Sequence, residues 1–382
     1  MLTPADLAAK PLPPQIWSDC CGNERDLWRR RMPARDRNTL TQTLGAHPAP
    51  FAQSVLGTVI ALSAAMTEVL HRIHQFAPAS TTVVLVGETG TGKSFFARVL
   101  HDVSGRTGRF CDVTAGEIHD SLAHDQLFGH VRGSFTGAVH RRVGLLADAA
   151  DGTLLLDDFH LLLRAEQAIL LRALEDEVFR PVGADRDLPV TCRLVVGLQR
   201  DLDELVASGA MLADLRHRLG HCVVRIPRLE ERRVEIAPFA QRFLEQCPGA
   251  TGVSDGPNRF APDVLPVLEA GTYAGNLRDL RERIRAAYLL GRGSEELKAE
   301  HLPESARVSL RFEPRADRAA QLRIVEWALW RTGDHVGRAA QLIGASRNTV
   351  SALRTVLRRE ATAASVAGLT STGAGDVETA AS

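Results

Sequence analysis

The sequence is poor in aromatic residues and has no excess of charge of either sign. Aromatic residues make up 5% of the chain and include only two tyrosines, while Lys+Arg and Asp+Glu number 46 each. This scarcity of rings argues against a nucleic-acid surface built on aromatic stacking. The formal net charge of zero excludes a globally basic coating protein, but it leaves room for a local basic patch.

Long apolar runs and paired cysteine motifs are also absent from the sequence. No segment reaches about 18 consecutive apolar residues, so we expect no membrane span and no membrane partner. The six cysteines form no C-x-x-C pair, and the chain is too long for a disulfide scaffold. We therefore expect reduced thiols in a cytoplasmic protein.

The length and composition fit a globular protein of several domains. The chain has 382 residues, of which 45% are hydrophobic, and this length allows about two or three domains. Seven of the 18 prolines fall within the first 50 residues. Residues 1–55 are therefore predicted to form an irregular N-terminal arm, with a short regulatory arm as the alternative.

From residue 56 the apolar residues follow a regular pattern, in which helical spacing alternates with short continuous runs that are typical of buried strands. Apolar spacing of three and four predicts a helix from Val59 to Ile73. Short β-branched apolar runs predict buried parallel strands over residues 82–86, 153–156 and 192–197. Helical stretches lie between them, as in residues 95–103 and 166–177. Strands that alternate with helices predict a parallel α/β domain over residues 56–228.

After residue 229 the pattern is helical. Amphipathic stretches over 230–247 and 276–291 predict a small all-α domain, residues 229–293, followed by a polar linker over 294–316. Residues 317–360 are predicted to be helical again, and they hold eight arginines against four acidic residues. Residues 361–382 are rich in Ala, Ser, Thr and Gly without a period, so we predict a disordered tail.

A complete phosphate-binding pattern follows the first predicted strand. The pattern G-x-x-x-x-G-K-[ST] is matched at every position by Gly87, Glu88, Thr89, Gly90, Thr91, Gly92, Lys93 and Ser94. Glycines let backbone N–H groups turn toward phosphate oxygens, and the following helix adds its positive N-terminus. Lys93 can reach the β- and γ-phosphates, and Ser94 can hold Mg²⁺. The alternative is a glycine-rich turn with an incidental lysine.

The expected partner of this loop is a strand that ends in acidic residues. Leu154-Leu155-Leu156 is followed by Asp157 and Asp158. Asp157 is predicted to bind Mg²⁺ directly or through water, and Asp158 to orient the attacking water. The two motifs together predict binding of ATP with Mg²⁺.

The segment between the two nucleotide motifs carries a family resemblance. Leu127-Phe128-Gly129-His130 precedes Gly133-Ser134-Phe135-Thr136-Gly137-Ala138. These motifs resemble those of the bacterial enhancer-binding proteins that activate sigma-54 RNA polymerase, whose hallmark G-A-F-T-G-A forms a hairpin tip inserted in an AAA+ ATPase. The resemblance runs from about residue 56 to 357 and includes residues 180–183, 213–219 and 273–280.

The resemblance implies an AAA+ α/β subdomain with a helical lid, in which Arg278 senses nucleotide. It implies self-association into a ring, such as a hexamer, in which Arg218 reaches the neighbouring subunit's ATP. It also implies that residues 133–138 contact sigma-54 RNA polymerase. Independently of the family, Phe135 and Thr136 between glycines are expected to form an exposed tip that grips a partner. An ordinary tight turn with a buried Phe135 is the alternative.

Members of this family end in a Fis-like helix-turn-helix, and the C-terminal stretch fits one. Residues 336–343 are predicted to be a helix, Gly344-Ala345 a turn, and Ser346 the cap of a second helix to Arg358. Arg347 and Asn348 are the predicted base contacts in DNA upstream of a promoter. Ser346, Thr349 and Arg354 are the predicted phosphate contacts. Residues 317–332 would form a helix that mediates dimerisation, and plain core packing is the alternative for this helix. For the helix from Arg347 to Arg358, the alternative is a solvated basic helix that packs on the lid.

Several positions depart from the family's pattern. The family has Asp-Glu where this chain has Asp157-Asp158, Asn at the position of Thr114, and Thr-Asn at Leu198-Gln199. Its first trans-acting arginine is replaced by Leu212, while Arg216 is a new candidate on the same short helix. Two interpretations follow: an ATP-driven activator, or a DNA-binding regulator in which ATP is structural. The second includes an attenuated partner of a paralogous subunit in a mixed ring.

Overall fold

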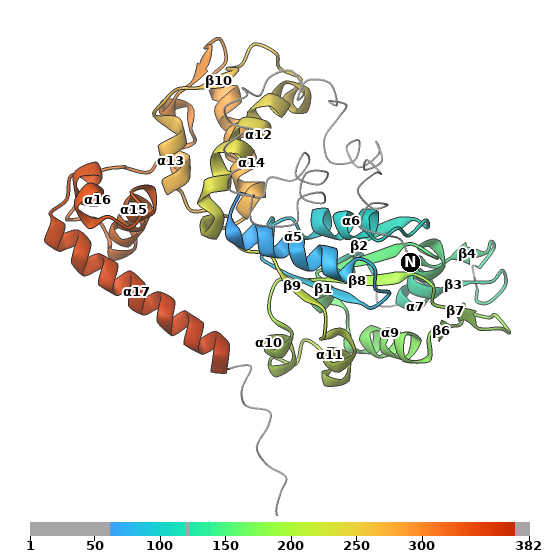
Figure 1. Ribbon diagram of the computed structural model, residues 1–382. Coiled ribbons are helices and arrows are strands. Elements are labelled where there is room, and N and C mark those ends of the chain that lie inside the picture. The colour runs from blue at the N-terminus through green and yellow to red at the C-terminus, as the bar shows by residue number, and fades with distance from the viewer. Residues whose placement is uncertain (1–61, 119–121, 137, 371–382) are drawn as a thin grey trace, which may run out of the picture. The chain divides into compact units, whose positions relative to one another are not determined.

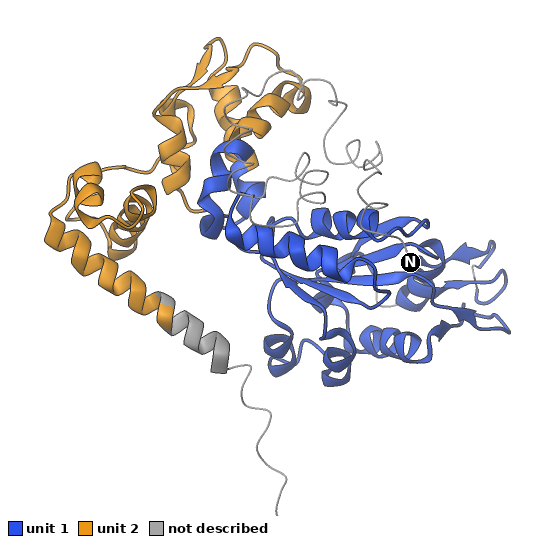
Figure 2. Ribbon diagram, in the orientation of Figure 1, with its two compact units in different colours: residues 1–239, 273–280 blue, residues 240–272, 281–382 orange. Residues whose placement is uncertain are grey.

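The computed structural model describes residues 62–118, 122–136 and 138–370. The arm predicted over residues 1–55 and Gly137 of the hairpin motif lie outside these residues. The chain forms two compact units (Figure 2). One contains residues up to Phe239 together with Tyr273–Leu280, and the other contains Ala240–Thr272 and the residues from Arg281 on. The first unit therefore extends beyond residue 228, where the sequence predicts a domain boundary, and also includes residues 273–280.

The first unit is built on a parallel sheet, as the sequence predicts, and the sheet has five strands (Figure 1). The strand order is β2-β5-β8-β1-β9. The strands are β1 (Val83–Val86), β2 (Phe110–Thr114), β5 (Thr153–Asp157), β8 (Arg193–Leu198) and β9 (Val223–Arg225). Every residue of β1 and β8 is buried, because helices cover both faces of a parallel sheet.

Alternate residues of each strand enter two separate cores. Val83 and Leu85 pack against α5 (Ala64–Phe76) and α6 (Lys93–Val103). Val84 and Val86 belong to the core on the opposite face. The helices of that second face are α7 (Ala123–Phe128), α8 (Leu145–Asp148), α9 (Arg164–Asp176), α10 (Leu202–Ala207) and α11 (Ala213–Leu219). Each fully buried Leu or Val contributes about 1.5–3 kcal/mol of transfer free energy.

A buried arginine joins the sheet to α5. Arg193 is fully buried in β8 and donates to the carbonyl oxygens of Phe76, Ala77 and Thr81 at 2.7, 3.0 and 3.1 Å. These contacts satisfy carbonyls at and just beyond the C-terminal end of the helix, where a positive charge is favourable. Burial lowers the pKa of Arg193 to about 10, so the guanidinium remains charged near neutral pH.

Two small hairpins extend from the first unit. Strand β3 (Gly129–His130) pairs with β4 (Arg142–Val143), and β6 (Val178–Phe179) pairs with β7 (Leu188–Pro189). A bridge between His130 and Val182 connects the hairpins. Gly129 has φ +80°, and a Cβ there would lie 2.4 Å from the carbonyl oxygen of Arg142, so this crossing requires glycine.

The rest of the chain is mainly helical. Helices α12 (Ile236–Thr251) and α14 (Asn276–Leu290) have residues in both units, and α13 (Val264–Ala270) belongs to the second. The C-terminal helices are α15 (Arg318–Arg331), α16 (Val336–Ile343) and α17 (Arg347–Thr370). None of the helices in the described part of the chain has the length and apolar character that a bilayer span needs.

Three sequence predictions need correction. Strands do not stop at residue 229, because β10 (Arg259–Phe260) and β11 (Glu296–Leu297) form a parallel pair. The linker predicted over 294–316 contains β11 and two 3-10 turns, Ala299–His301 and Glu304–Ala306. Disorder from residue 361 is wrong for residues 361–370, which continue α17. Alanine favours helix strongly, so this alanine-rich segment needs no apolar period to extend one.

Candidate nucleotide site and its accessory elements

The phosphate loop joins β1 to α6, in the strand–loop–helix order that the sequence predicts. Gly90 and Gly92 have φ of +73° and +107°, which a side chain would strain. A Cβ at Gly90 would also lie 2.1 Å from the carbonyl oxygen of Gly275. The loop therefore has the glycines that its turns require, and it ends at the N-terminus of an 11-residue helix, which favours an anion.

Lys93 and Ser94, at the start of α6, face the acidic end of β5. The Lys93 Nζ donates to the carbonyl oxygen of Gly87 at 3.1 Å and lies 3.8 Å from Asp157 Oδ1. Ser94 Oγ donates to Asp157 Oδ2 at 3.4 Å. A Cβ at Gly197 of β8 would lie 2.1 Å from Asp157 Oδ1, so glycine there leaves room for the carboxylate. A hydroxyl beside a carboxylate is an oxygen donor set that fits Mg²⁺.

Asp158 adopts an uncommon backbone conformation and has a defined partner. Its φ and ψ are +51° and +41°, and its N–H donates to Asp157 Oδ1 at 2.9 Å. The amide Nε2 of Gln199, just beyond β8, donates to Asp158 Oδ1 at 2.9 Å. The two departures from the family pattern, Asp158 and Gln199, are therefore in direct contact. Thr114 lies on β2 in register with Asp157, and Leu198 is fully buried in β8.

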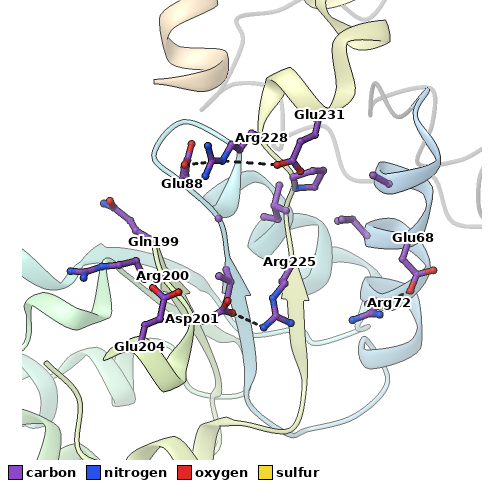
Figure 3. Close-up of a pocket in the computed structure, with 16 residues that line it drawn as sticks. Glu68, Arg72, Glu88, Gln199, Arg200, Asp201, Glu204, Arg225, Arg228 and Glu231 are labelled. Carbon is purple, nitrogen blue, oxygen red and sulfur yellow. Dashed lines mark hydrogen bonds and ion pairs between the residues drawn. The ribbon is translucent and has the colours of Figure 1, made fainter. Parts of the chain in front are cut away.

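A pocket of about 680 Å³ opens beside the phosphate loop (Figure 3). Gly87 and Glu88 of the loop and Gln199 contribute to its lining. Charged side chains dominate its rim, where Glu88 pairs with Arg228 at 2.9 Å and Asp201 pairs with Arg225 at 2.6 Å. Gln199 thus both lines this pocket and holds Asp158, and the volume suits a small-molecule ligand.

The start of α14 contacts the phosphate loop. Arg278, which the sequence singles out, donates from Nη1 to Thr89 Oγ1 at 3.4 Å. The backbone N–H of Leu277 donates to the carbonyl oxygen of Gly90 at 3.0 Å. Asn276 is buried with φ +50°; its Nδ2 donates to the Thr89 carbonyl at 3.0 Å, and its Oδ1 accepts from Leu229 N at 2.7 Å. Sequence reasoning missed Asn276, although asparagine is among the residues that adopt positive φ most easily.

Sequence reasoning also missed a buried ion pair behind the loop. Arg232 donates from Nη2 to the carbonyl oxygen of Thr91 at 2.8 Å and from Nη1 to Glu235 Oε2 at 3.4 Å. Glu235 Oε1 accepts from the N–H and hydroxyl of Ser63, which caps α5. Burial lowers the pKa of Arg232 and raises that of Glu235. The pair fixes the phosphate loop relative to α5.

The two candidate arginines on α11 have partners within the subunit. Arg216 Nε lies 2.8 Å from Asp203 Oδ1, and Arg218 donates to the carbonyl oxygen of Leu174. Leu212 precedes the helix, packs against the core, and donates its backbone N–H to Gln167 Oε1 at 3.0 Å. The structure therefore places both arginines on one short helix, as predicted, and leaves their action on a neighbouring subunit a prediction.

The described residues of the motif, 133–136 and Ala138, lie in the loop of the β3–β4 hairpin. Gly133 has φ +81°, and its N–H donates to the carbonyl oxygen of Ala138 at 2.8 Å, which closes the tip. Phe135 is 43% exposed, and its ring meets His130 edge-on at 5.0 Å between centroids. Phe135 is therefore not buried in a tight turn, but one edge of its ring is in contact with the hairpin. Thr136 is exposed, and the Ser134 hydroxyl is buried without a hydrogen-bond partner among the described residues.

The base of this hairpin is held by charge. Asp125 accepts from His130 Nδ1, and Asp125 Oδ2 accepts from Arg142 Nη1 at 2.9 Å. The other ring nitrogen of His130 lies 2.7 Å from the carbonyl oxygen of His140. One buried carboxylate therefore links both strands of the hairpin, and His130 connects that base to the ring of Phe135.

The C-terminal helices and the turn follow the prediction. Gly344 has φ +70°, and Ser346 Oγ accepts from Thr349 N at 3.0 Å as an N-cap. Arg347 lies against Gly337, since a Cβ at Gly337 would be 3.2 Å from its Nε. Asn348 is exposed. Arg354, a predicted phosphate contact, donates instead to Asp334, which also accepts from Arg358 at 2.8 Å.

The parallel sheet, the phosphate loop and the helical lid define an AAA+ nucleotide-binding protein. The chain matches the family described as "Sigma-54 interaction domain" over residues 59–225 and the "AAA+ ATPase lid domain" over residues 230–318. It is 32% identical over 311 residues to the transcriptional regulatory protein ZraR of Salmonella typhimurium, covering 79% of this chain and 69% of that protein. The chain therefore belongs to the family of sigma-54-dependent transcriptional activators.

Other relatives support this membership. The Nif-specific regulatory protein of Herbaspirillum seropedicae is 37% identical over 239 residues, which are 62% of this chain but only 44% of that protein. The crystal structure of NtrX from Brucella abortus in complex with ADP covers 85% of this chain and 73% of its own, with 29% identity and a TM-score of 0.64. NtrX in complex with ATP matches with 28% identity and a TM-score of 0.59.

Proposed function

We propose that the chain is an ATP-driven transcriptional activator. ATP would be held by residues 87–94, with the Lys93 ammonium at the phosphates and Ser94 and Asp157 at Mg²⁺. Arg278 would sense the nucleotide from the lid. Asp158 would orient the attacking water. The grouping of Lys93, Ser94 and Asp157 at one end of the sheet supports this assignment, because phosphoryl transfer depends on positioned charge.

The action proposed for this ATPase is remodelling of sigma-54 RNA polymerase in the cytoplasm. Subunits would associate into a ring, such as a hexamer, in which Arg218 and Arg216 approach the neighbouring subunit's ATP. The hairpin residues 133–138 would contact the sigma factor. The observation that carries this proposal is the half-exposed ring of Phe135 on a hairpin whose base is held by charge, because an exposed aromatic at a fixed tip suits partner contact.

The C-terminal helices are proposed to bind DNA upstream of a promoter. The second helix would enter the major groove with Arg347 and Asn348 at base edges and Ser346 and Thr349 at phosphates. Arg354 would reach phosphate after leaving Asp334. Helix α15 would form a dimer, and the 39% exposure of Trp330 leaves apolar surface for a second copy.

A second function remains a candidate because of the arginine contacts. Arg216 and Arg218 are both engaged within the subunit, and Asp158 is shorter than the glutamate of the family. A regulator that uses ATP only as a structural ligand, or an attenuated partner of a paralogous subunit, would have these features. Steady-state ATPase and sigma-54-dependent transcription assays on the full chain, with and without DNA, separate the two. ATP binding without turnover or activation would favour the second function.

Replacing Asp158 by glutamate is expected to slow ATP hydrolysis. The Gln199 amide is bonded to the shorter acid at 2.9 Å, so an added methylene displaces the carboxylate by about 1 Å and lowers kcat on the order of 10- to 100-fold. In the double variant Asp158→Glu with Gln199→Asn, the acid gains one methylene and the amide side chain loses one. The hydrogen bond between them can then form again, and most of kcat should be restored. KM for ATP should stay unchanged in both. A faster Asp158→Glu enzyme would contradict this geometry.

Removal of the Arg347 side chain is expected to weaken specific DNA binding. If the guanidinium reads a guanine, Arg347→Ala should cost about 1–3 kcal/mol at the specific site and relax its sequence preference. Arg359→Ala, which alters an exposed arginine later in the same helix, is the matched control. Gel-shift titrations against duplexes selected from a random pool measure both. A fragment ending at Leu310 that keeps full affinity and specificity would overturn this assignment.

A further inference from the structure

The lid helix α13 and the C-terminal helix α15 are joined by a buried carboxylate. Arg331, the last residue of α15, donates from Nη1 to Glu269 Oε1 at 3.0 Å and to Oε2 at 2.9 Å. Glu269 is only 6% exposed. A buried carboxylate is costly unless a cation pairs with it, so the contact holds the two helices in a defined arrangement.

The neighbouring residue extends this contact into an apolar core. Ala270, the last residue of α13, is fully buried in one cluster with Val325 and Ala328 of α15. The segment before α15 joins the same cluster through Phe312, whose N–H donates to the carbonyl oxygen of Ile343 at 2.8 Å. The C-terminal helices and the lid therefore share one core in addition to the chain that connects them.

The end of α13 lies only a few residues before the residues of α14 that contact the phosphate loop. Five residues separate Ala270 from Asn276, whose side chain donates to the carbonyl oxygen of Thr89. The next residue, Leu277, donates its N–H to the Gly90 carbonyl. A nucleotide that displaces the phosphate loop must also displace Asn276 and Leu277, which are bonded to it. Only the short segment 271–275 separates these residues from the end of α13.

We propose that α13 couples the nucleotide site to the DNA-binding helices. This inference rests on the proposed ATP and DNA binding, but it goes beyond both. ATP displaces residues 275–278, the short segment 271–274 transmits the shift to α13, and α15 follows because the ion pair of Glu269 and Arg331 joins it to α13. Coupling between two binding sites is reciprocal, so DNA bound at the C-terminal helices changes the affinity for ATP by the same factor.

Hydrogen exchange on the full chain, with and without ATPγS and Mg²⁺, tests the coupling. In the wild type, exchange should slow at residues 87–94 and change by about fivefold or more in α15. Replacing Glu269 and Arg331 both by glutamine removes both charges of the ion pair. In this double variant the response at 87–94 should persist, while the response of α15 should be lost.

Arg318→Ala is the matched control, because Arg318 is exposed on the first turn of the same helix. It should respond as the wild type does, and melting curves verify that every variant is folded. A response of α15 that survives in the double variant, or a wild-type response confined to residues 87–94, would overturn the coupling alone. A wild type in which neither segment responds would overturn the proposed nucleotide site as well.

Discussion

Replacing Lys93 by alanine is expected to weaken ATP binding strongly. The Nζ lies buried among loop carbonyls, 3.1 Å from Gly87 O and 3.8 Å from Asp157 Oδ1, where the β- and γ-phosphates are expected. Its removal leaves phosphate charge without its buried cation, and losing one partner of such a contact costs about 2–5 kcal/mol. The Kd for a fluorescent ATP analogue should rise on the order of 30-fold or more.

The chain offers a matched control for this substitution. Lysine occurs at only three positions, Lys10, Lys93 and Lys298. The exposed Lys298 lies 3.6 Å from Glu300, and an exposed pair of this kind contributes little to stability. Lys298→Ala should therefore bind the analogue as the wild type does. Equal affinities for Lys93→Ala and the wild type would remove the basis for the nucleotide site.

The parts of the site that sequence reasoning predicted are those whose residues are close along the chain. The phosphate loop is one run of eight residues, and Asp157 directly follows a continuous apolar strand. The cap at Ser346 and the turn at Gly344 likewise depend on local geometry. Such features follow from backbone conformation and side-chain reach over a few residues, so a single sequence suffices to predict them.

The parts that were missed depend on contacts between distant segments. Arg232 bonds to Thr91, 141 residues away, and Asn276 bonds to Thr89, 187 residues away. In the sequence, Arg232 belongs to a polar run that is typical of a solvated helix face. Nothing in the local pattern distinguishes a buried arginine from an exposed one, because its burial depends on where α5 and the phosphate loop lie.

The two strands of the five-stranded sheet that sequence reasoning missed, β2 and β9, lie at its edges. Strand β2 contains Asp112 and Thr114 and is not fully buried, and β9 has only three residues. Edge strands pair on one side only, so they lack the continuous apolar run that identifies central strands. The central strands β1, β5 and β8 were predicted correctly because both of their faces are covered.

Replacing Phe135 by alanine is expected to reduce sigma-54-dependent activation strongly while ATP hydrolysis continues. The ring is 43% exposed and rests edge-on against His130, whereas the phosphate loop, Asp157 and Gln199 lie at the ends of strands β1, β5 and β8. In the proposed sigma-54 contact the ring is the aromatic anchor, and truncation of such an anchor costs about 2–4 kcal/mol. Open-complex formation on a sigma-54 promoter should therefore fall on the order of 30-fold or more.

Two measurements separate this result from a folding defect. The β3–β4 hairpin should remain formed without the ring, because Asp125 still bonds to His130 and Arg142 at its base. Steady-state ATPase and ATP affinity of Phe135→Ala should therefore equal those of the wild type. Val139→Ala removes another exposed apolar side chain of the same loop, 62% exposed, and should keep activation. Unchanged activation by Phe135→Ala would contradict sigma-54 remodelling through this tip, whereas a simultaneous loss of ATPase would mean that the ring supports the fold.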